Sequence, residues 1–378
     1  MSKINVRSPY FINISNYGLA SVELKLYIYS ALQTSDRPAT ATYTLNADAV
    51  LGGTGTNNAS FEVAELVRDY ISNTFNDTYS SKNLWVDYTT QETTLTGTTG
   101  SVSAFTQLEA FDGYGYFEEG SNPQNTQTIL QSNKTIYKYS DEPLRLPVHI
   151  TTSTEFTFLQ DGTSVYNTTL STSTISTNII RYVSSETTGI QSWQDRVEAD
   201  SGTIESLDCV KDHLGDVDLY GVDTIYVNDG NTVEVYKVEN IEECKYNPYK
   251  VTFVNKFGAL QDLWFFKKAN LSLSTKNEEY TANTVSNGSY SINRASKTIF
   301  NKTGTEMLKL NTGFYPESYN EIFRQLSLSE EVWIKYEGQT LPIIVKTSSL
   351  NYKTSINDKL INYTMDVEFA FNKINNIR

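Results

Sequence analysis

Alternation of apolar and polar residues is the strongest pattern along the chain, and it predicts strands. Between residues 22 and 29 every second residue is apolar, which places Val22, Leu24, Leu26 and Ile28 on one face. Residues 363–371 alternate as strictly, with Tyr363, Met365, Val367, Phe369 and Phe371 on one face. Both segments therefore read as half-buried strands.

Shorter apolar and β-branched runs predict further strands. Residues 222–227 and 232–238 flank the turn sequence Asn228-Asp229-Gly230-Asn231, which is typical of a β-hairpin. The Thr- and Gly-rich tract 89–100 is expected to be an exposed hairpin tip. Other predicted strands cover residues 84–88, 102–108, 144–148, 155–158, 179–183, 249–254, 263–266, 332–334 and 341–345.

Two segments have helical spacing instead. Pro316 opens a run in which Tyr319, Ile322, Phe323 and Leu326 recur on one side of a helix. Residues 61–71 also fit a short amphipathic helix, with a strand over 61–67 as the alternative.

These elements predict a mainly β protein made of successive antiparallel β-sandwich-like domains with one or two short amphipathic helices. A length of 378 residues favours two or three domains. The sequence character changes near residues 159 and 246, so we expect an N-terminal β domain at 1–158, a small middle β domain at 159–245 and a C-terminal β domain with one helix at 246–378.

Charge and cysteine content narrow the function. A net charge of -14 disfavours nucleic acid and anionic membranes as partners. The polar start of the chain, without an apolar signal segment, leads us to expect synthesis in the cytosol without an export signal. The two cysteines, Cys209 and Cys244, are too few for a disulfide framework; they are either free thiols or one bridge.

The chain has few histidines and no well-spaced catalytic motif, so we expect no enzyme activity, no catalytic residues, no metal site and no cofactor. His149 lies in an apolar strand-like segment and is expected to be structural, whereas His213 lies among carboxylates and leaves a metal site as an alternative. Glu118-Glu119 and Glu330-Glu331 are adjacent pairs, which rarely form the opposed carboxylates of a glycosidase.

The Gly-rich segment 112–127 is expected to be a long surface loop, because it combines several glycines and a proline with aromatic residues. Its aromatic side chains are candidates for a recognition tip, or else for a plug of the domain's own core. The candidate contact residues are Phe111, Tyr114, Tyr116 and Phe117.

Three stretches carry a family resemblance: residues 247–266, residues 310–314 and residues 352–371, together with the opening Val6-Arg7-Ser8-Pro9-Tyr10 and residues 22–29. In these stretches the chain resembles tail proteins of phages and prophages of Bacteroidetes-type bacteria. The resemblance implies a virion protein of the tail tip, baseplate or tail adaptor, assembled in the host cytoplasm. It also implies that copies of the chain and other phage tail proteins are the partners.

Other function classes remain open. The loop aromatics are compatible with a receptor- or carbohydrate-binding tail module, whose partner would be a host-surface receptor or glycan. A depolymerase would need carboxylates that meet in a groove.

Overall fold

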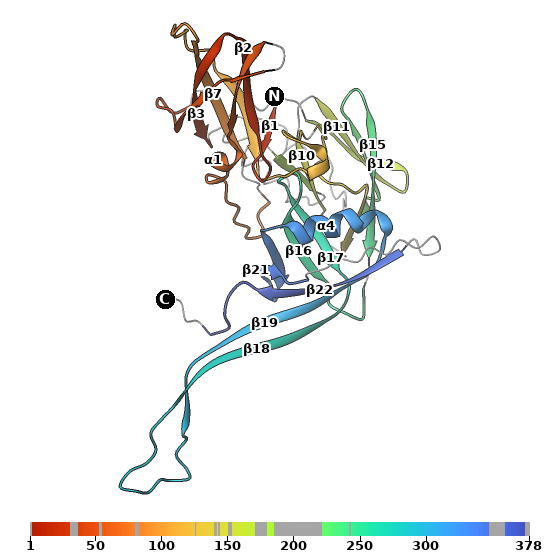
Figure 1. Ribbon diagram of the computed structural model, residues 1–378. Coiled ribbons are helices and arrows are strands. Elements are labelled where there is room, and N and C mark those ends of the chain that lie inside the picture. The colour runs from red at the N-terminus through yellow and green to blue at the C-terminus, as the bar shows by residue number, and fades with distance from the viewer. Residues whose placement is uncertain are drawn as a thin grey trace. The chain divides into compact units, whose positions relative to one another are not determined.

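The computed structural model describes residues 2–30, 37–52, 55–79, 83–124, 126–139, 142, 144–149, 153–170, 180–184, 221–241, 243–347 and 360–374 (Figure 1). The chain is mainly β, with several antiparallel sheets and few short helices, which confirms the predicted fold class. It forms two compact units: residues 1–242 with 252–263, and residues 243–251 with 264–378.

The first unit begins with a β-sandwich. One sheet has the order β1-β8-β7-β3-β4 and the other the order β2-β6-β5. The strands are β1 (Lys3–Asn5), β2 (Phe11–Tyr17), β3 (Leu19–Tyr29), β4 (Tyr43–Asp48), β5 (Val50–Leu51), β6 (Thr56–Glu62), β7 (Asn83–Thr94) and β8 (Thr106–Phe111).

The core of this sandwich confirms the pattern that predicted β3. Val22, Leu24, Leu26 and Ile28 are buried in one cluster with apolar residues of β1, β2, β6, β7 and β8. The helix expected over residues 61–71 is shorter: Phe61 lies in β6 opposite Ile12, and α1 covers only Ala64–Arg68. Strand β8 likewise begins at Thr106, later than the expected residue 102.

A second group of sheets in the first unit surrounds a separate core. One sheet has the order β12-β11-β14-β15-β9 and the other pairs β10 with β13. The core contains Phe156, Phe158, Leu146, Ile225 and Val227. The strands are β9 (Thr135–Tyr139), β10 (Arg145–His149), β11 (Thr154–Gln160), β12 (Thr163–Leu170), β13 (Ile180–Ser184), β14 (Thr224–Asn228) and β15 (Val233–Ile241).

Strand pairing in this second group crosses the position expected for a domain boundary. The boundary at residues 158/159 falls inside β11, which pairs with β12 on one side and with β14 on the other. Strand β15 also pairs in parallel with β9, which joins residues 237–241 to residues 135–139. Hydrogen-bonded ladders thus connect residues on both sides of the expected boundary, whereas the second unit begins at residue 243, close to the expected 245/246.

The second unit contains most of a sheet with the order β17-β16-β20-β21-β22-β19-β18. Residues 252–263, which comprise the end of β16, the turn after it and the start of β17, belong to the first unit. The strands are β16 (Tyr249–Val254), β17 (Leu260–Phe265), β18 (Lys267–Thr281), β19 (Lys297–Pro316), β20 (Val332–Tyr336), β21 (Gln339–Val345) and β22 (Leu360–Phe369). The three strands predicted near the C-terminus are present and pair antiparallel, β20 with β21 and β21 with β22.

An amphipathic helix packs on this sheet, as the sequence predicts. Helix α4 (Asn320–Leu328) follows the short 3-10 helix η5 (Glu317–Tyr319), and its apolar residues Ile322, Phe323 and Leu326 are buried. The Phe323 ring lies 4.6 Å from the ring of Tyr363 on β22 and 5.9 Å from the ring of Tyr315 on β19. Aromatic contacts of this kind hold the helix against β19 and β22.

Candidate functional site

The four aromatic residues predicted as a contact loop divide into two pairs. Phe111 ends β8 and is buried with its ring 5.5 Å from the His149 ring. Tyr114 is also buried, and the Arg7 guanidinium lies 5.2 Å from its ring centroid. These two side chains fill the protein's own core, which was the alternative to a recognition tip.

The loop between them is fastened to its neighbours by backbone hydrogen bonds. Arg7 N donates to Gly113 O at 3.0 Å, and Tyr114 N donates to Lys256 O at 2.9 Å. A side chain at Gly113 would have no space, because its Cβ would lie 2.7 Å from Asn5 Oδ1 and 2.8 Å from Lys256 O. The glycine therefore allows the close approach of three segments.

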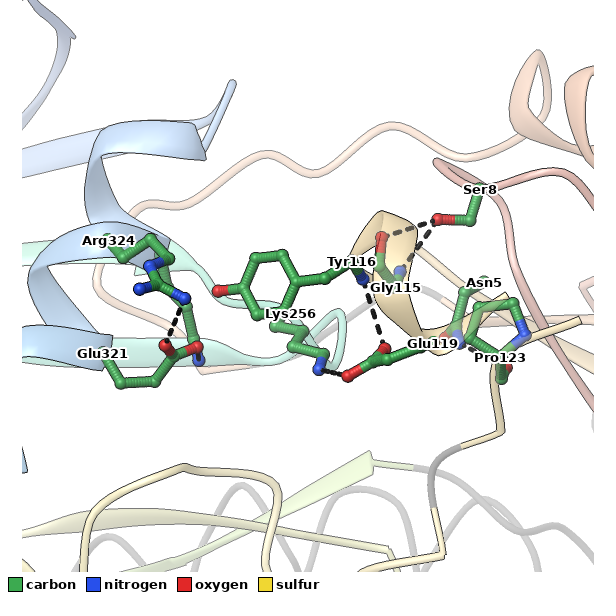
Figure 2. Close-up of polar contacts among 10 residues, drawn as sticks. Asn5, Ser8, Gly115, Tyr116, Glu119, Pro123, Lys256, Glu321 and Arg324 are labelled. Atoms are coloured by element: carbon green, nitrogen blue, oxygen red, sulfur yellow. Dashed lines mark hydrogen bonds and ion pairs between the residues drawn. The ribbon is translucent and has the colours of Figure 1, made fainter. Parts of the chain in front are cut away.

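Side-chain bonds complete the attachment, as Figure 2 shows. Ser8 Oγ accepts from Gly115 N at 2.8 Å, and Asn5 Nδ2 donates to Pro123 O at 2.8 Å. Lys256 pairs with Glu119, whose other oxygen accepts from Tyr116 N at 3.2 Å. The described residues of the predicted surface loop are therefore fastened by hydrogen bonds and an ion pair, and they include one short 3-10 helix, η2 (Phe117–Glu119).

Tyr116 and Phe117 are the part of the loop that reaches the surface. Tyr116 is half-buried, with Lys256 Nζ 4.5 Å from its ring centroid. Phe117 is 99% exposed at the start of η2. A contact role in this loop would rest on these two residues.

A buried polar cluster lies beneath the loop. Lys3 Nζ is 3.0 Å from His149 Nδ1, and His149 Nε2 is 3.1 Å from Glu109 Oε2. Lys3 has only donors, so it donates to Nδ1, and the neutral imidazole then donates from Nε2 to the carboxylate. Burial lowers the pKa of His149, while its hydrogen bond to Glu109 acts in the opposite direction; burial also lowers the pKa of Lys3, against the attraction of Glu109.

This cluster is placed to hold elements together and not to meet a substrate. The side chains of His149 and Glu109 are each 1% exposed, and they link β10 to β8 while Lys3 comes from β1. The cluster therefore gives His149 the structural role expected of it, because paired and buried groups fix the arrangement of neighbouring elements.

No metal centre emerges from the part of the chain that the structure describes, where no three His, Cys, Asp or Glu side chains are grouped to hold an ion. His213 and Cys209 lie outside the described residues. Cys244 is exposed and forms no disulfide with a described residue. Glu118 and Glu119 lie side by side on η2, on the same short surface turn.

The most unusual surface is a long hairpin in the second unit. Strands β18 and β19 pair from Lys267 to Thr281, and Figure 1 shows them running away from the rest of their sheet. Strand β22 pairs with β19 only from Met307 onward. We call residues 271–306 the arm; along it, the described part of the chain contributes only the strands β18 and β19 to the sheet.

The arm exposes apolar side chains on a large scale. Eight of the 24 exposed large apolar residues of the described chain lie within residues 271–300: Leu271, Leu273, Tyr280, Val285, Tyr290, Ile292, Ile299 and Phe300. Phe300 is 63% exposed, and its ring lies 6.1 Å from that of Tyr280. Clustered exposed apolar residues mark interaction surfaces, and a two-stranded ribbon is marginally stable without further packing.

Charge also sets the arm apart. Residues 280–305 include Arg294, Lys297 and Lys302 and no acidic residue, although the whole chain carries -14. The acidic residues Glu278 and Glu279 follow Lys276 on β18. The arm thus combines apolar side chains with charges of both signs.

Sequence reasoning missed this arm, although one signal marked it. Asn287-Gly288 has positive φ at both residues, 53° and 73°, as a two-residue hairpin turn requires. Ser286 and Ser289 flank the turn with reciprocal backbone bonds of 2.9 and 3.1 Å. Beyond Leu271 and Leu273, the flanking segments are rich in Ser, Thr and Asn and lack the sustained apolar alternation that identifies a half-buried strand.

No family model matches the chain, and no curated protein matches it. In the described part of the chain, no helix has both the length and the apolar character required to span a bilayer.

Proposed function

We propose that the chain is a bacteriophage virion structural protein, a tail-tip, baseplate or tail-adaptor component that works by assembling with copies of itself and with other tail proteins. The observation that carries the proposal is the arm. An extended ribbon with exposed Leu273, Ile299 and Phe300 is stabilised when another subunit covers it, and unpaired strand edges favour the same outcome.

The rest of the described chain supports an assembly role over turnover. Its one described histidine, His149, is buried against Glu109 and Lys3, where a substrate cannot reach it. A rigid β scaffold that presents a protruding ribbon is suited to contacts between subunits, which form large interfaces. The resemblance to phage tail proteins points to the same class.

A particle-incorporation experiment tests the proposal. Peptides of the chain should be found by mass spectrometry in purified phage particles. In the matching variant, residues 273–306 are replaced by Asn-Gly, which joins Ser272 to its cross-strand partner Met307 by a two-residue turn. We expect this variant to fold and to be lost from particles.

The matched control is Phe117→Ser, which removes an exposed aromatic ring outside the arm. It should enter particles as the parent chain does. Absence of the parent chain from particles would refute the proposed function. Normal incorporation of the armless variant would show that the arm is not required for assembly.

A second candidate function, a receptor- or carbohydrate-binding tail module, is favoured by the exposure of Phe117 beside Tyr116. Aromatic side chains at a fixed loop are suited to sugar rings. Binding to a glycan array that disappears in Phe117→Ala and Tyr116→Ala would support it. Tyr114 is unsuited to the test, because it is buried and its loss would disturb the loop.

A further inference from the structure

Strand β18 is an edge strand, since it ends the order of its sheet. No strand of the described residues pairs with its outer edge, which runs along Lys267–Thr281. An edge of this length offers a row of backbone N–H and C=O groups to an added strand. The partner that fits it can be inferred from which groups face outward and from the side chains beside them.

Two backbone bonds establish which residues face outward. Ala282 N donates to Ser296 O at 2.7 Å, so Ala282 points toward β19. Lys373 N donates to Gly304 O at 2.7 Å, so Gly304 points away from β18, and its cross-strand partner Thr275 must point to the free edge. In an antiparallel ladder successive residues alternate between the two sides.

Both observations give the same alternation. The N–H and C=O groups of Leu273, Thr275, Asn277, Glu279 and Thr281 face the free edge. The register shift next to Glu278 does not disturb it, because the extra residue, Phe300, lies in β19.

The side chains around Asn277 are self-complementary. If two β18 edges pair antiparallel with Asn277 opposite Asn277, Lys276 of each copy lies opposite Glu278 of the other. These are non-hydrogen-bonded positions, where the Cα atoms are about 4.5 Å apart and side chains approach most closely. The outward groups of Asn277 then form the central hydrogen-bonded pair, as the alternation requires.

We propose that the arm pairs with the arm of a second copy of this chain through β18, around a two-fold axis at Asn277. A two-fold contact uses the same surface on both subunits, and this segment satisfies that condition in both charge and backbone direction. About ten backbone hydrogen bonds would form between residues 273 and 281 of the two copies. The inference rests on the assembly role proposed above and names the partner of the arm.

The same register suits the larger side chains. Tyr280 of one copy lies opposite Ser274 of the other, a small residue that leaves room for the ring. Leu273 lies opposite Thr281, so an apolar side chain meets a β-branched one. The product is a four-stranded ribbon, in which each β18 is an inner strand.

Charge reversal tests the pairing, with mass measured by light scattering over a range of concentrations. The parent chain should dimerise. K276E alone sets acidic side chains against one another, E278K alone sets basic ones against one another, and each should weaken dimerisation roughly tenfold at low salt. The double variant K276E/E278K should restore it.

Mixing provides the sharper test. The two single variants are complementary to each other, so an equimolar mixture should form heterodimers although neither dimerises well alone. High salt should reduce all these differences, because exposed charges are screened. Only a contact of β18 with β18 predicts recovery in the mixture.

Cysteine cross-linking tests whether the two-fold axis lies at Asn277. In a C209S/C244S background, N277C should form a disulfide-linked dimer under mild oxidation, since Cα atoms of a hydrogen-bonded pair lie about 5.5 Å apart. The control S274C should not, because two copies of residue 274 are far apart in this register. Equal cross-linking of both variants would overturn the proposed register.

The remaining outcomes separate this inference from the proposed function. A parent chain that stays monomeric, or a mixture that fails to recover, overturns arm pairing even if the chain is found in phage particles. Dimers with the predicted charge dependence in a chain absent from particles would uphold the pairing and refute the function.

Discussion

Strands β3 and β18 are both long and both carry apolar residues at alternate positions, yet they end in opposite environments. In β3, Val22, Leu24 and Leu26 are almost completely buried in the core of the first sandwich. In β18, Leu271 and Leu273 remain 51% and 58% exposed. Strand β3 lies between β7 and β4 in its sheet, whereas β18 has one neighbour among the described strands.

The difference teaches that alternation identifies a strand but does not say what covers its apolar face. In β3 a second sheet supplies the cover, so burial contributes to folding of the single chain. In the arm, the described chain supplies no such layer, and the same kind of side chain remains available to another subunit. Four matched substitutions or conditions test this contrast.

The largest difference is expected from one substitution made in both strands. Leu24→Ala should lower the free energy of unfolding by about 2–5 kcal/mol, because it leaves a cavity in a closed core. Leu273→Ala should change it by less than about 0.5 kcal/mol in the monomer, because the side chain is already exposed. Urea unfolding measures both; equal effects would contradict the contrast.

Carboxylates of the two regions should also differ in how much they contribute to the free energy of unfolding. Glu109→Gln removes the charge that accepts from His149 within a buried cluster, and should cost about 2–3 kcal/mol of unfolding free energy. Glu278→Gln, on the exposed arm, should leave the unfolding transition of the monomer in place. A Glu109→Gln variant as stable as the parent would show that the cluster does not stabilise the fold.

Glycines provide a third comparison. Gly113→Ala should destabilise the first unit by about 1–3 kcal/mol, because the added Cβ would overlap Asn5 Oδ1 and Lys256 O. At Gly304 the Cβ would lie 3.3 Å from Leu273 Cδ1, the end of a side chain that is free to move. We expect Gly304→Ala to be neutral or slightly stabilising. The melting temperatures of the two variants, compared with that of the parent chain, test both expectations.

The smallest effect is a pH dependence confined to the buried region. Burial lowers the pKa of His149 in the folded chain below its ordinary value near 6.5, so the unfolded chain binds the proton first as pH falls. Stability should therefore be intact above that value and decrease on acidification below it, until the folded histidine also titrates.

The arm has no histidine and should not contribute to this dependence. Urea midpoints at neutral and mildly acidic pH, in the parent chain and in His149→Asn, measure the difference. If the urea midpoint depends on pH equally strongly in both chains, the pH dependence comes from groups other than His149.

Much of the candidate site was beyond the reach of the sequence. The pattern of Tyr319, Ile322, Phe323 and Leu326 was sufficient to predict α4, because a helix face is a local property. The loop aromatics were identified as a group, but the burial of Tyr114 depends on contacts with Arg7 and Lys256, which are distant in sequence. The contact of Lys3, Glu109 and His149 depends in the same way on three separated strands.

The sequence by itself determined the mainly β character, most strands, the helix after Pro316 and the turn at Asn228–Asn231, because these follow from periodicity and turn chemistry over a few residues. Only the tertiary structure decided which apolar faces are covered and that β18 is left as an edge. It also decided that β11 pairs with β14 and β9 with β15, across the boundary expected at residue 158. Those outcomes depend on pairings between residues far apart in the chain, for which no local pattern carries the information.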